Sequence, residues 1–312
     1  MQNSGRVDLT CDDRGLRCIN PRSLSSIPAA WPTRMADSNL PTVIVTHKLS
    51  DAWLAQLDGR CRALIGPEAG QVEGLARELQ EQLGEAEGLF ALLTVPVDEA
   101  LLSQAPKLRV VSNMAVGVDN IDLAACTRRG IPVGHTPGVL TEGTADLAMA
   151  LLLAVARKLA EASRDARVGK WTTWLPDGWL GADMYGATLG IVGMGKIGRA
   201  VAERARAFGT ELVYASRSPK PEVDKALGGK RLPLEELLGC SDFVSLHVPL
   251  SEGTRGLIDR PRLRLMKPTA ILINTARGPV VDPDALYQAL SEGYRGFRAR
   301  RGRHLDRGHP RG

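Results

Sequence analysis

The sequence contains no apolar run long enough to cross a membrane. Its longest such run is the ten residues 147–156, whereas a bilayer span needs roughly 20. The first 40 residues also lack the apolar segment of a secretory signal, and Asp8, Asp12 and Asp13 argue against a transit peptide. We therefore expect a cytoplasmic protein with no membrane partner.

Cysteines and aromatic side chains are few. The five cysteines stand at scattered positions without metal-ligand spacing, and their odd number indicates reduced thiols. We therefore expect no metal site. Aromatic residues make up 4% of the chain, which leaves little surface for stacking nucleic-acid bases.

Excess positive charge is confined to one end of the chain. The formal net charge is +5, yet residues 294–312 alone contain seven arginines and a single acid, Asp306. Because the remainder is close to neutral, we expect no nucleic-acid partner. A basic arm for nucleic acid or a membrane surface is the competing interpretation of this tail.

Between residues 42 and 293, short β-rich runs alternate with helical stretches, which is typical of an α/β fold with parallel sheets. The predicted strands cover residues 42–46, 89–95, 108–113, 131–133, 188–192, 212–215, 243–247 and 270–275. The predicted helices cover residues 52–57, 72–83, 98–103, 121–128, 142–168, 197–208, 234–238, 261–266 and 283–292. The helix 142–168 is apolar nearly all round through Ala156, so we expect it to be buried and to link two lobes.

A glycine-rich turn directly follows the predicted strand 188–192. The letters GMGKIG, from Gly193 to Gly198, match the G-x-G-x-x-G pattern and open a helix with one apolar face. Gly193 permits the tight turn, Gly195 lets the backbone approach a pyrophosphate, and Gly198 lets the helix pack on the strand. The N–H groups at the helix start would hold the anion, so the turn predicts a dinucleotide site.

The end of the next strand predicts which dinucleotide is bound. An NAD site usually has an acid there for the ribose 2′-hydroxyl, whereas this chain has Ser216 near that position. Arg217 is a bidentate partner for a 2′-phosphate, and Lys220 would assist it. This favours NADPH over NADH; the alternative is that Arg217 is a solvated loop charge.

Two further loops follow predicted strands. Arg277 lies at the end of the strand 270–275, on the sheet edge where ligands bind in open α/β sheets. It is suited to a bidentate grip on a substrate carboxylate and to polarising an adjacent carbonyl; a surface salt bridge is the alternative. In the first half of the chain, small residues at 114–119 expose backbone N–H groups after another strand.

Four segments together resemble one family, the D-isomer-specific 2-hydroxyacid dehydrogenases, and within it the glyoxylate/hydroxypyruvate reductases. They occur in the family's order and cover roughly residues 41–293. They read VGVDNIDLAACTRRGIPVGHTPGVLTEGTADLAMALLL (116–153), LGIVGMGKIGRAVA (189–202), YASRSPKPE (214–222) and INTARGPVVDPDALYQALSEG (273–293).

The resemblance implies an α/β fold of two Rossmann-like lobes with parallel sheets, one flavodoxin-like for substrate and one for the dinucleotide, truncated at the C-terminus. We expect a disordered extension at 1–40, the substrate (catalytic) domain at 41–140 and a basic disordered tail at 294–312. The NAD(P)-binding Rossmann domain would cover 141–293, including the linking helix and an arm at 170–183 that pairs subunits as homodimers. Trp171, Trp174 and Trp179 lie in this arm, and we expect them to anchor the interface between subunits.

The resemblance also implies site residues. Arg277 would be the catalytic arginine, and the substrate carboxylate would be bound by Arg277 and by the backbone amides of Val116 and Gly117. The cofactor site would comprise Gly193, Gly195, Lys196, Ile197, Gly198, Arg217, Ser218, Pro219, Lys220, Pro249 and Thr275. The implied reaction is NADPH-dependent reduction of small 2-oxo acids, glyoxylate to glycolate and hydroxypyruvate to D-glycerate.

After Gly293 the sequence departs from the family pattern. In the family, a glutamate and the histidine that acts as general acid come after this point. In this chain the tail contains only His304, His309 and Asp306, and no strand is predicted there to place them. We therefore expect slow turnover. A change of reading frame or an alternative exon would explain the tail.

Two alternative functions stay open. In one, the protein binds a dinucleotide without catalysis; in the other, it dimerises with a complete relative and lowers the activity of that relative. The remaining histidines, His47, His135 and His247, lie in or beside predicted strands, where we expect core or turn roles.

Overall fold

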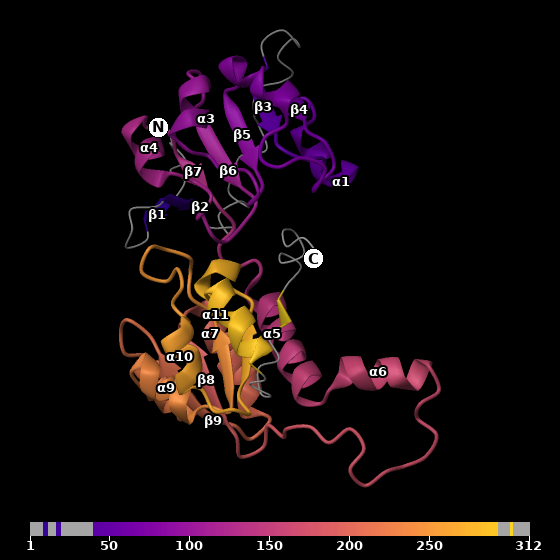
Figure 1. The fold of residues 1–312 in the computed structure, drawn as a ribbon. Coiled ribbons are helices and arrows are strands. Elements are labelled where there is room, and N and C mark those ends of the chain that lie inside the picture. Colours follow the sequence, from indigo (N-terminus) through magenta and orange to yellow (C-terminus); the bar gives the residue numbers. More distant parts are fainter. Residues whose placement is uncertain (1–8, 12–16, 20–39, 293–299, 302–312) are drawn as a thin grey trace, which may run out of the picture. The chain divides into compact units, whose positions relative to one another are not determined.

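The computed structural model describes residues 9–11, 17–19, 40–292 and 300–301. The chain divides into two compact units, Met1–Val139 and Leu140–Gly312, each with its own core. The division lies one residue from the boundary expected between the substrate and cofactor domains. Each unit is built on a parallel sheet, so the predicted α/β class is confirmed (Figure 1).

The first unit contains a five-stranded parallel sheet in the order β4-β3-β5-β6-β7. The strands are β3 (Thr42–Val45), β4 (Arg62–Ile65), β5 (Gly88–Ala91), β6 (Val110–Asn113) and β7 (Val133–Gly134). The helices are α1 (Asp51–Leu54), α2 (Arg77–Gln80), α3 (Glu99–Gln104) and α4 (Leu123–Arg128). Ile44, Leu89 and Val111, from the three central strands, are almost fully buried in one core.

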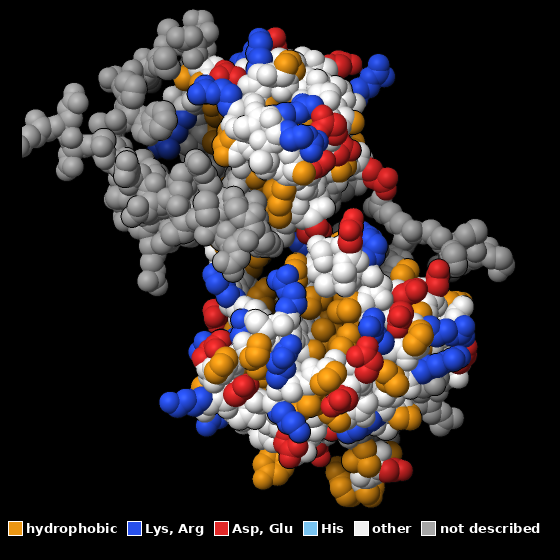
Figure 2. Space-filling view, turned by 90° about the vertical axis from the view of Figure 1, so that its left-hand side faces the viewer, with side chains coloured by type: hydrophobic (Ala, Val, Ile, Leu, Met, Phe, Trp, Pro, Cys, Tyr) orange, Lys and Arg blue, Asp and Glu red, His pale blue; other side chains and the backbone are white. Residues whose placement is uncertain are grey.

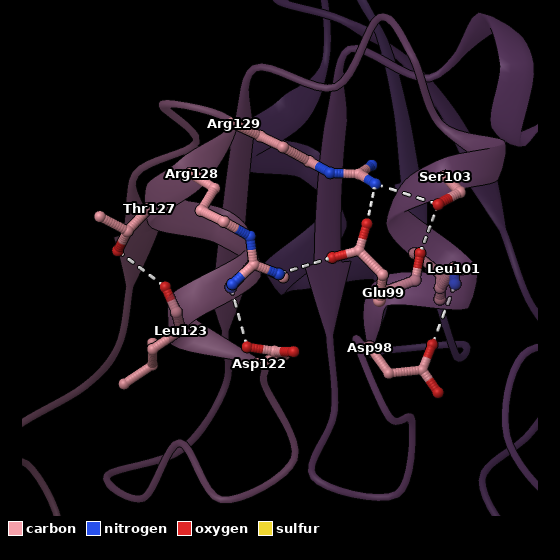
Figure 3. Close-up of polar contacts among 10 residues, drawn as sticks. Asp98, Glu99, Leu101, Ser103, Asp122, Leu123, Thr127, Arg128 and Arg129 are labelled. Atoms are coloured by element: carbon pink, nitrogen blue, oxygen red, sulfur yellow. Dashed lines mark hydrogen bonds and ion pairs between the residues drawn. The ribbon is translucent and has the colours of Figure 1, made fainter.

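Helices α3 and α4 are joined by an ion-pair cluster (Figure 3). Glu99 of α3 accepts hydrogen bonds from Arg128, at 3.0 Å, and from Arg129. Each helix also begins at an aspartate that caps it: Asp98 accepts from the N–H of Leu101 and Asp122 from that of Ala125. These local contacts fix the two helices that follow β5 and β6.

Two elements of the first unit differ from the sequence-based prediction. Strand β4 was not predicted, because an edge strand that is half exposed lacks a clear apolar alternation. The helix predicted over 72–83 is reduced to α2 and a 3₁₀ turn at Leu83–Glu85. The reason is Gly74, whose φ of +73° interrupts the helical conformation.

Short strands also occur in both segments that were expected to be disordered. β1 (Leu9–Cys11) and β2 (Arg17–Ile19) pair antiparallel, and β13 (Arg300–Arg301) pairs parallel with the strand Ile271–Asn274. Strand pairing satisfies the hydrogen-bonding groups of the main chain, which are the same for nearly every residue type. The amino-acid composition of these segments therefore did not reveal the strands. The remaining parts of 1–40 and 294–312 lie outside the described residues, apart from the end of the extension at residue 40.

The second unit contains a parallel sheet in the order β10-β9-β8-β11-β12-β13. Its other strands are β8 (Thr188–Val192), β9 (Glu211–Ala215), β10 (Lys230–Arg231), β11 (Phe243–Leu246) and β12 (Ile271–Asn274). The helices are α5 (Thr141–Ala156), α6 (Leu159–Arg167), α7 (Lys196–Arg206), α8 (Pro221–Leu227), α9 (Leu234–Cys240), α10 (Arg260–Leu265) and α11 (Pro283–Ser291).

Helices cover both faces of this sheet (Figure 1). α5 and α7 pack against each other and share one core cluster with the sheet, whereas α9, α10 and α11 share the other. The strands are buried on both faces: Phe243 of β11 belongs to the first cluster and its neighbour Val244 to the second. Neither α8 nor β10 was predicted from the sequence.

The single helix predicted over 142–168 is wrong, since the structure has two helices, α5 and α6. Lys158 adopts a left-handed φ of 51° between them. The carbonyl oxygen of Ala156 accepts a hydrogen bond from the N–H of Ala182 at 3.0 Å instead of continuing the helix. A segment 26 residues further along the chain therefore ends α5, which no local pattern could indicate.

The expected all-round burial of α5 is also wrong. Ala148 and Leu152 are fully buried on the side that packs against α7 and β12, but Leu147 is 53% exposed. α6 has no buried residue, and residues 168–181 extend with it away from the body of the unit before the chain returns to β8 (Figure 1).

Figure 2 shows one face of the molecule, on which hydrophobic side chains are interspersed with charged ones.

Candidate functional site

The glycine-rich turn lies between β8 and α7, and its three glycines differ in backbone conformation and in the space around them. Gly193 has a φ of +99°, and a Cβ added there would lie 2.7 Å from the carbonyl carbon of His247. A Cβ at Gly198 would lie 2.2 Å from the carbonyl oxygen of Gly193, so the helix approaches the turn closely. Around Gly195, apart from its two neighbours in the chain, no described residue has an atom within 4 Å of such a Cβ. The turn is therefore tight on one side and open at Gly195.

The start of α7 offers backbone donors beside this opening. Gly195 is the N-cap residue, and no side chain caps the helix. Gly195 and Lys196 are exposed and Ile197 is partly exposed. The first N–H groups of a helix lack intrahelical partners and attract anions. A dinucleotide pyrophosphate fits this open, uncapped turn.

The loop after β9 carries the positive charges expected for the cofactor. Arg217, Ser218 and Pro219 are exposed and Lys220 is partly exposed. The Ser216 hydroxyl donates to the carbonyl oxygen of Ser218 at 2.6 Å, which holds the loop in a turn. Among the described residues, no side chain forms a hydrogen bond or ion pair with the Arg217 guanidinium.

The loop after β12 presents Arg277. The residue is partly exposed, and its Nη1 donates to the carbonyl oxygen of Ala276 at 3.0 Å. Asn274, the last residue of β12, donates from Nδ2 to the carbonyl oxygen of Arg277 at 2.8 Å and accepts from the N–H of Ala276 at 3.0 Å. Asn274 therefore holds both sides of the loop that carries the arginine.

Thr275 and Pro249 lie on the same edge of the sheet. Thr275 Oγ1 is buried and has no hydrogen-bond partner in the described parts of the chain. Pro249 is exposed after β11, and its carbonyl oxygen accepts from the hydroxyl of Thr254 at 2.6 Å. The turn at 193–198 and the loops with Arg217, Pro249 and Arg277 thus follow four strands that are neighbours in the order β9-β8-β11-β12.

The loop with Val116 and Gly117 belongs to the first unit, at the carboxyl end of β6. Asn113, the last residue of that strand and 1% exposed, donates to the carbonyl oxygen of Gly117 at 2.8 Å. It also contacts Asn120, which donates to the carbonyl oxygens of Leu92 and Val95. Val116 itself is exposed.

His135 contacts this same loop. Its Nδ1 lies 3.0 Å from the carbonyl oxygen of Val116, an arrangement in which the ring donates. The sequence-based expectation was a core or turn histidine; the structure places it partly exposed in the loop after β7. The contacts of Asn113, Asn274 and His135 were missed because each depends on a loop carbonyl, which has no sequence signal.

Of the other two histidines in the described residues, His47 is buried and His247 is partly buried. His247 follows β11, and its Nε2 lies 2.8 Å from the hydroxyl of Ser245. Burial lowers the pKa of His247 to about 4, so its imidazole is neutral near pH 7. Burial also lowers the pKa of His47, which lies at the end of β3 beside Thr46. Neither ring carries an extra proton at neutral pH.

The described residues contain neither a cluster of metal-ligating side chains nor a membrane-spanning helix. Among them, no group of three or more His, Cys, Asp or Glu residues is placed to hold a metal ion. No helix in the same residues is long and apolar enough to span a membrane.

The chain matches known proteins across both units. Residues 149–297 match the family described as D-isomer specific 2-hydroxyacid dehydrogenase, NAD binding domain, four residues beyond the expected end at Gly293. The chain is 48% identical over 255 residues to a glyoxylate reductase of Korarchaeum cryptofilum, covering 81% of this chain and 76% of that protein.

Solved structures show the same relationship. A crystal structure of a protein from Thermus thermophilus matches with a TM-score of 0.76 and 44% identity, over 86% of this chain and 85% of that chain. A D-lactate dehydrogenase from Aquifex aeolicus, solved with NAD and lactic acid, matches with a TM-score of 0.73 and 31% identity, over 81% and 74%. The NAD-binding domain indicates a nicotinamide dinucleotide cofactor, and the chain belongs to the D-isomer-specific 2-hydroxyacid dehydrogenase family.

Proposed function

We propose that the chain binds NADPH and reduces small 2-oxo acids, glyoxylate to glycolate and hydroxypyruvate to D-glycerate. The observation that carries the proposal is the common sheet edge of the glycine turn, the Arg217 loop and Arg277, which follow β8, β9 and β12. Relatives named glyoxylate reductase, such as the Korarchaeum protein, support the substrate class.

The preference for NADPH rests on the loop after β9. Ser216 stands where a carboxylate would repel a 2′-phosphate, and the exposed Arg217 guanidinium forms no hydrogen bond or ion pair with a side chain among the described residues. A guanidinium matches the oxygens of a phosphate in a bidentate geometry. Gly195, Lys196 and Ile197 would hold the pyrophosphate at the start of α7, with Gly193 and Gly198 shaping the turn.

Substrate binding would use Arg277 and the loop with Val116 and Gly117. Arg277 would grip the substrate carboxylate and polarise the keto group as charge develops on its oxygen. The backbone amides of Val116 and Gly117 would also bind the substrate carboxylate. When bound, NADPH would supply the hydride to the carbonyl carbon of the 2-oxo acid, which becomes the alcohol carbon of the 2-hydroxy acid.

The proton for the new hydroxyl needs a separate donor. His47 and His247 are neutral near pH 7 because burial lowers the pKa of each ring. The resemblance assigns the proton to a histidine paired with a glutamate, and the segment after Gly293 has no matching residues. We therefore propose slow turnover for a protein of this sequence.

A second candidate function is dinucleotide binding without catalysis, including modulation of a complete relative through mixed dimers. The observation in its favour is the exposed arm at 170–183, in which Trp174 is 77% exposed. A large exposed aromatic side chain is a typical interface anchor. Independently of which candidate holds, we propose that the chain forms a homodimer through this arm.

The test titrates NADPH and NADH into the protein and then measures hydroxypyruvate reduction. We expect tighter binding of NADPH, and Arg217→Ser is expected to lose about tenfold or more of that affinity while NADH binding stays unchanged. Arg264→Ser, which removes an exposed arginine from α10, serves as the matched control.

The outcomes separate the two candidates. Equal binding of NADPH and NADH would overturn the cofactor assignment. Ordinary turnover of hydroxypyruvate would overturn the proposed slow catalysis, and loss of that turnover in His135→Gln would show that His135 contributes to it, as proton donor or through its bond to the Val116 loop. NADPH binding without turnover, with mixed dimers in co-purification, would favour the non-catalytic role.

A further inference from the structure

The backbone of the loop that carries Arg217 is held by a second arginine on the neighbouring strand. Arg231 lies on β10, in register with Tyr214 of β9. Its Nε and Nη2 donate to the carbonyl oxygen of Ser216 at 3.1 and 2.9 Å, and Nη2 also donates to that of Arg217 at 3.2 Å. One guanidinium therefore binds two consecutive carbonyl groups of the loop.

Tyr214 holds the other end of the loop. Its hydroxyl accepts a hydrogen bond from the N–H of Lys220 at 3.0 Å and donates to Oδ1 of Asp224 at 2.8 Å. Burial and the bond to Asp224 raise the pKa of Tyr214, so the hydroxyl stays protonated and keeps both bonds. The loop is thus fixed at both ends, in addition to the internal bond from Ser216.

These contacts decide which groups the loop offers to an anion. Backbone carbonyl oxygens carry partial negative charge and would repel a phosphate, but two of them are bound to the Arg231 guanidinium. The side chain of Arg217 remains exposed on the same loop. A loop that is already ordered also loses less conformational entropy when a ligand binds.

We propose that Arg231 is a positioning residue that determines cofactor specificity. By binding the carbonyl oxygens of Ser216 and Arg217, it orders the loop so that the Arg217 side chain meets the 2′-phosphate. The inference rests on the proposed preference for NADPH and adds to it a residue that touches the loop backbone. Its action depends on the fork of the guanidinium, which the single ammonium of a lysine does not reproduce.

The test measures binding of two cofactor fragments to the full chain by calorimetry. Adenosine 2′,5′-bisphosphate contains the 2′-phosphate, and adenosine 5′-monophosphate lacks it. Arg231→Gln and Arg231→Lys are each expected to weaken binding of the bisphosphate by about tenfold, the size expected for hydrogen bonds to a charged group. Binding of the monophosphate should change by less than about twofold in both variants.

Lys230→Gln is the matched control, because it removes one positive charge from the adjacent exposed position of β10. We expect it to bind both fragments within about twofold of the unaltered protein. Tyr214→Phe is a second variant: it releases the Lys220 end of the loop and should also weaken bisphosphate binding selectively. Retained binding of the monophosphate shows in every case that the unit is folded.

Each contrary result has a distinct meaning. If Arg231→Lys binds the bisphosphate like the unaltered protein and Arg231→Gln does not, Arg231 acts through charge, and the positioning role is wrong. If both bind it normally, Arg231 has no part in specificity. If the unaltered protein binds the two fragments equally well, the preference for NADPH itself fails, which is distinguishable from failure of the Arg231 role alone.

Discussion

Asparagine ends a central strand in each unit and organises the loop that follows. Asn113 ends β6 and donates to the carbonyl oxygen of Gly117; Asn274 ends β12 and donates to that of Arg277, both at 2.8 Å. An amide side chain can donate to one backbone group and accept from another, as Asn274 does. Two loops with proposed substrate contacts are therefore held by asparagine side chains that bind the loop backbone.

Replacing Asn274 by aspartate tests this role. We expect Asn274→Asp to lower the free energy of unfolding by about 1–3 kcal/mol, because a carboxylate oxygen would replace the donor that faces the Arg277 carbonyl. Urea unfolding measures the change. Gln288→Glu makes the same amide-to-acid change on the exposed face of α11 and should leave stability within about 0.5 kcal/mol. Equal stability of the two variants would contradict the prediction.

His247 makes stability depend on pH. Because its pKa in the folded protein is about 4 and its ordinary value is 6.5, the unfolded chain binds the proton more tightly. The contribution is therefore fully present above pH 6.5 and is lost as the pH falls towards 4, by up to about 3 kcal/mol.

Urea unfolding of the unaltered protein and of His247→Gln between about pH 7 and about pH 4 measures this contribution. The stability of the unaltered protein relative to the variant should decrease as the pH falls. A difference that stays constant over this range would show that His247 does not titrate in this way.

At the scale of elements, prediction from sequence succeeded where the pattern is local. β8 was predicted with the bounds Thr188–Val192, and α7, β11 and β12 were predicted within two residues at each end. The same local motifs pointed to the glycine turn, Arg217 and Arg277. The break after α5 was missed because Ala182 ends that helix from a distant part of the chain. The Arg231 contacts were missed because they cross between strands.

Gly181 tests the packing that ends α5. A Cβ at this position would lie 2.1 Å from the carbonyl oxygen of Ala156, where backbone cannot yield easily. We expect Gly181→Ala to lower the free energy of unfolding by about 1–3 kcal/mol.

The matched control is Gly143→Ala within α5, where the added Cβ meets no atom within 4 Å in the described residues. It should raise stability by about 0.5–1 kcal/mol, because alanine favours helix. Thermal unfolding of the two variants measures both effects, and a Gly181→Ala protein as stable as the unaltered one would contradict the close approach.

At the scale of the whole molecule, the arm at 170–183 is the clearest candidate for a contact between copies of the chain. Trp171, Trp174, Leu175 and Leu180 are all more than half exposed. Exposed apolar side chains gathered on one projecting segment are typical of an interface. The proposed homodimer would bury them.

Light scattering coupled to gel filtration tests the proposed homodimer. We expect a dimer for the unaltered chain and a monomer for Trp174→Ser combined with Leu175→Ser, because an aromatic anchor is worth about 2 kcal/mol or more at an interface. Trp53→Ser changes a tryptophan that is also exposed, but in the first unit, and should leave the dimer intact. Dissociation by both changes, or by neither, would contradict the assignment of the arm.

The bond between Ala156 and Ala182 and the ion pair of Arg157 and Asp183, at 2.7 Å, close the base of the segment that contains α6 and the arm. α5 and β8, on either side of the arm, bury side chains in the same core cluster. A cut within the arm would therefore leave both ends held by the body. Two separately made fragments divided there should assemble by complementation, and we expect that the arm can be exchanged for another sequence without rebuilding the dinucleotide-binding domain.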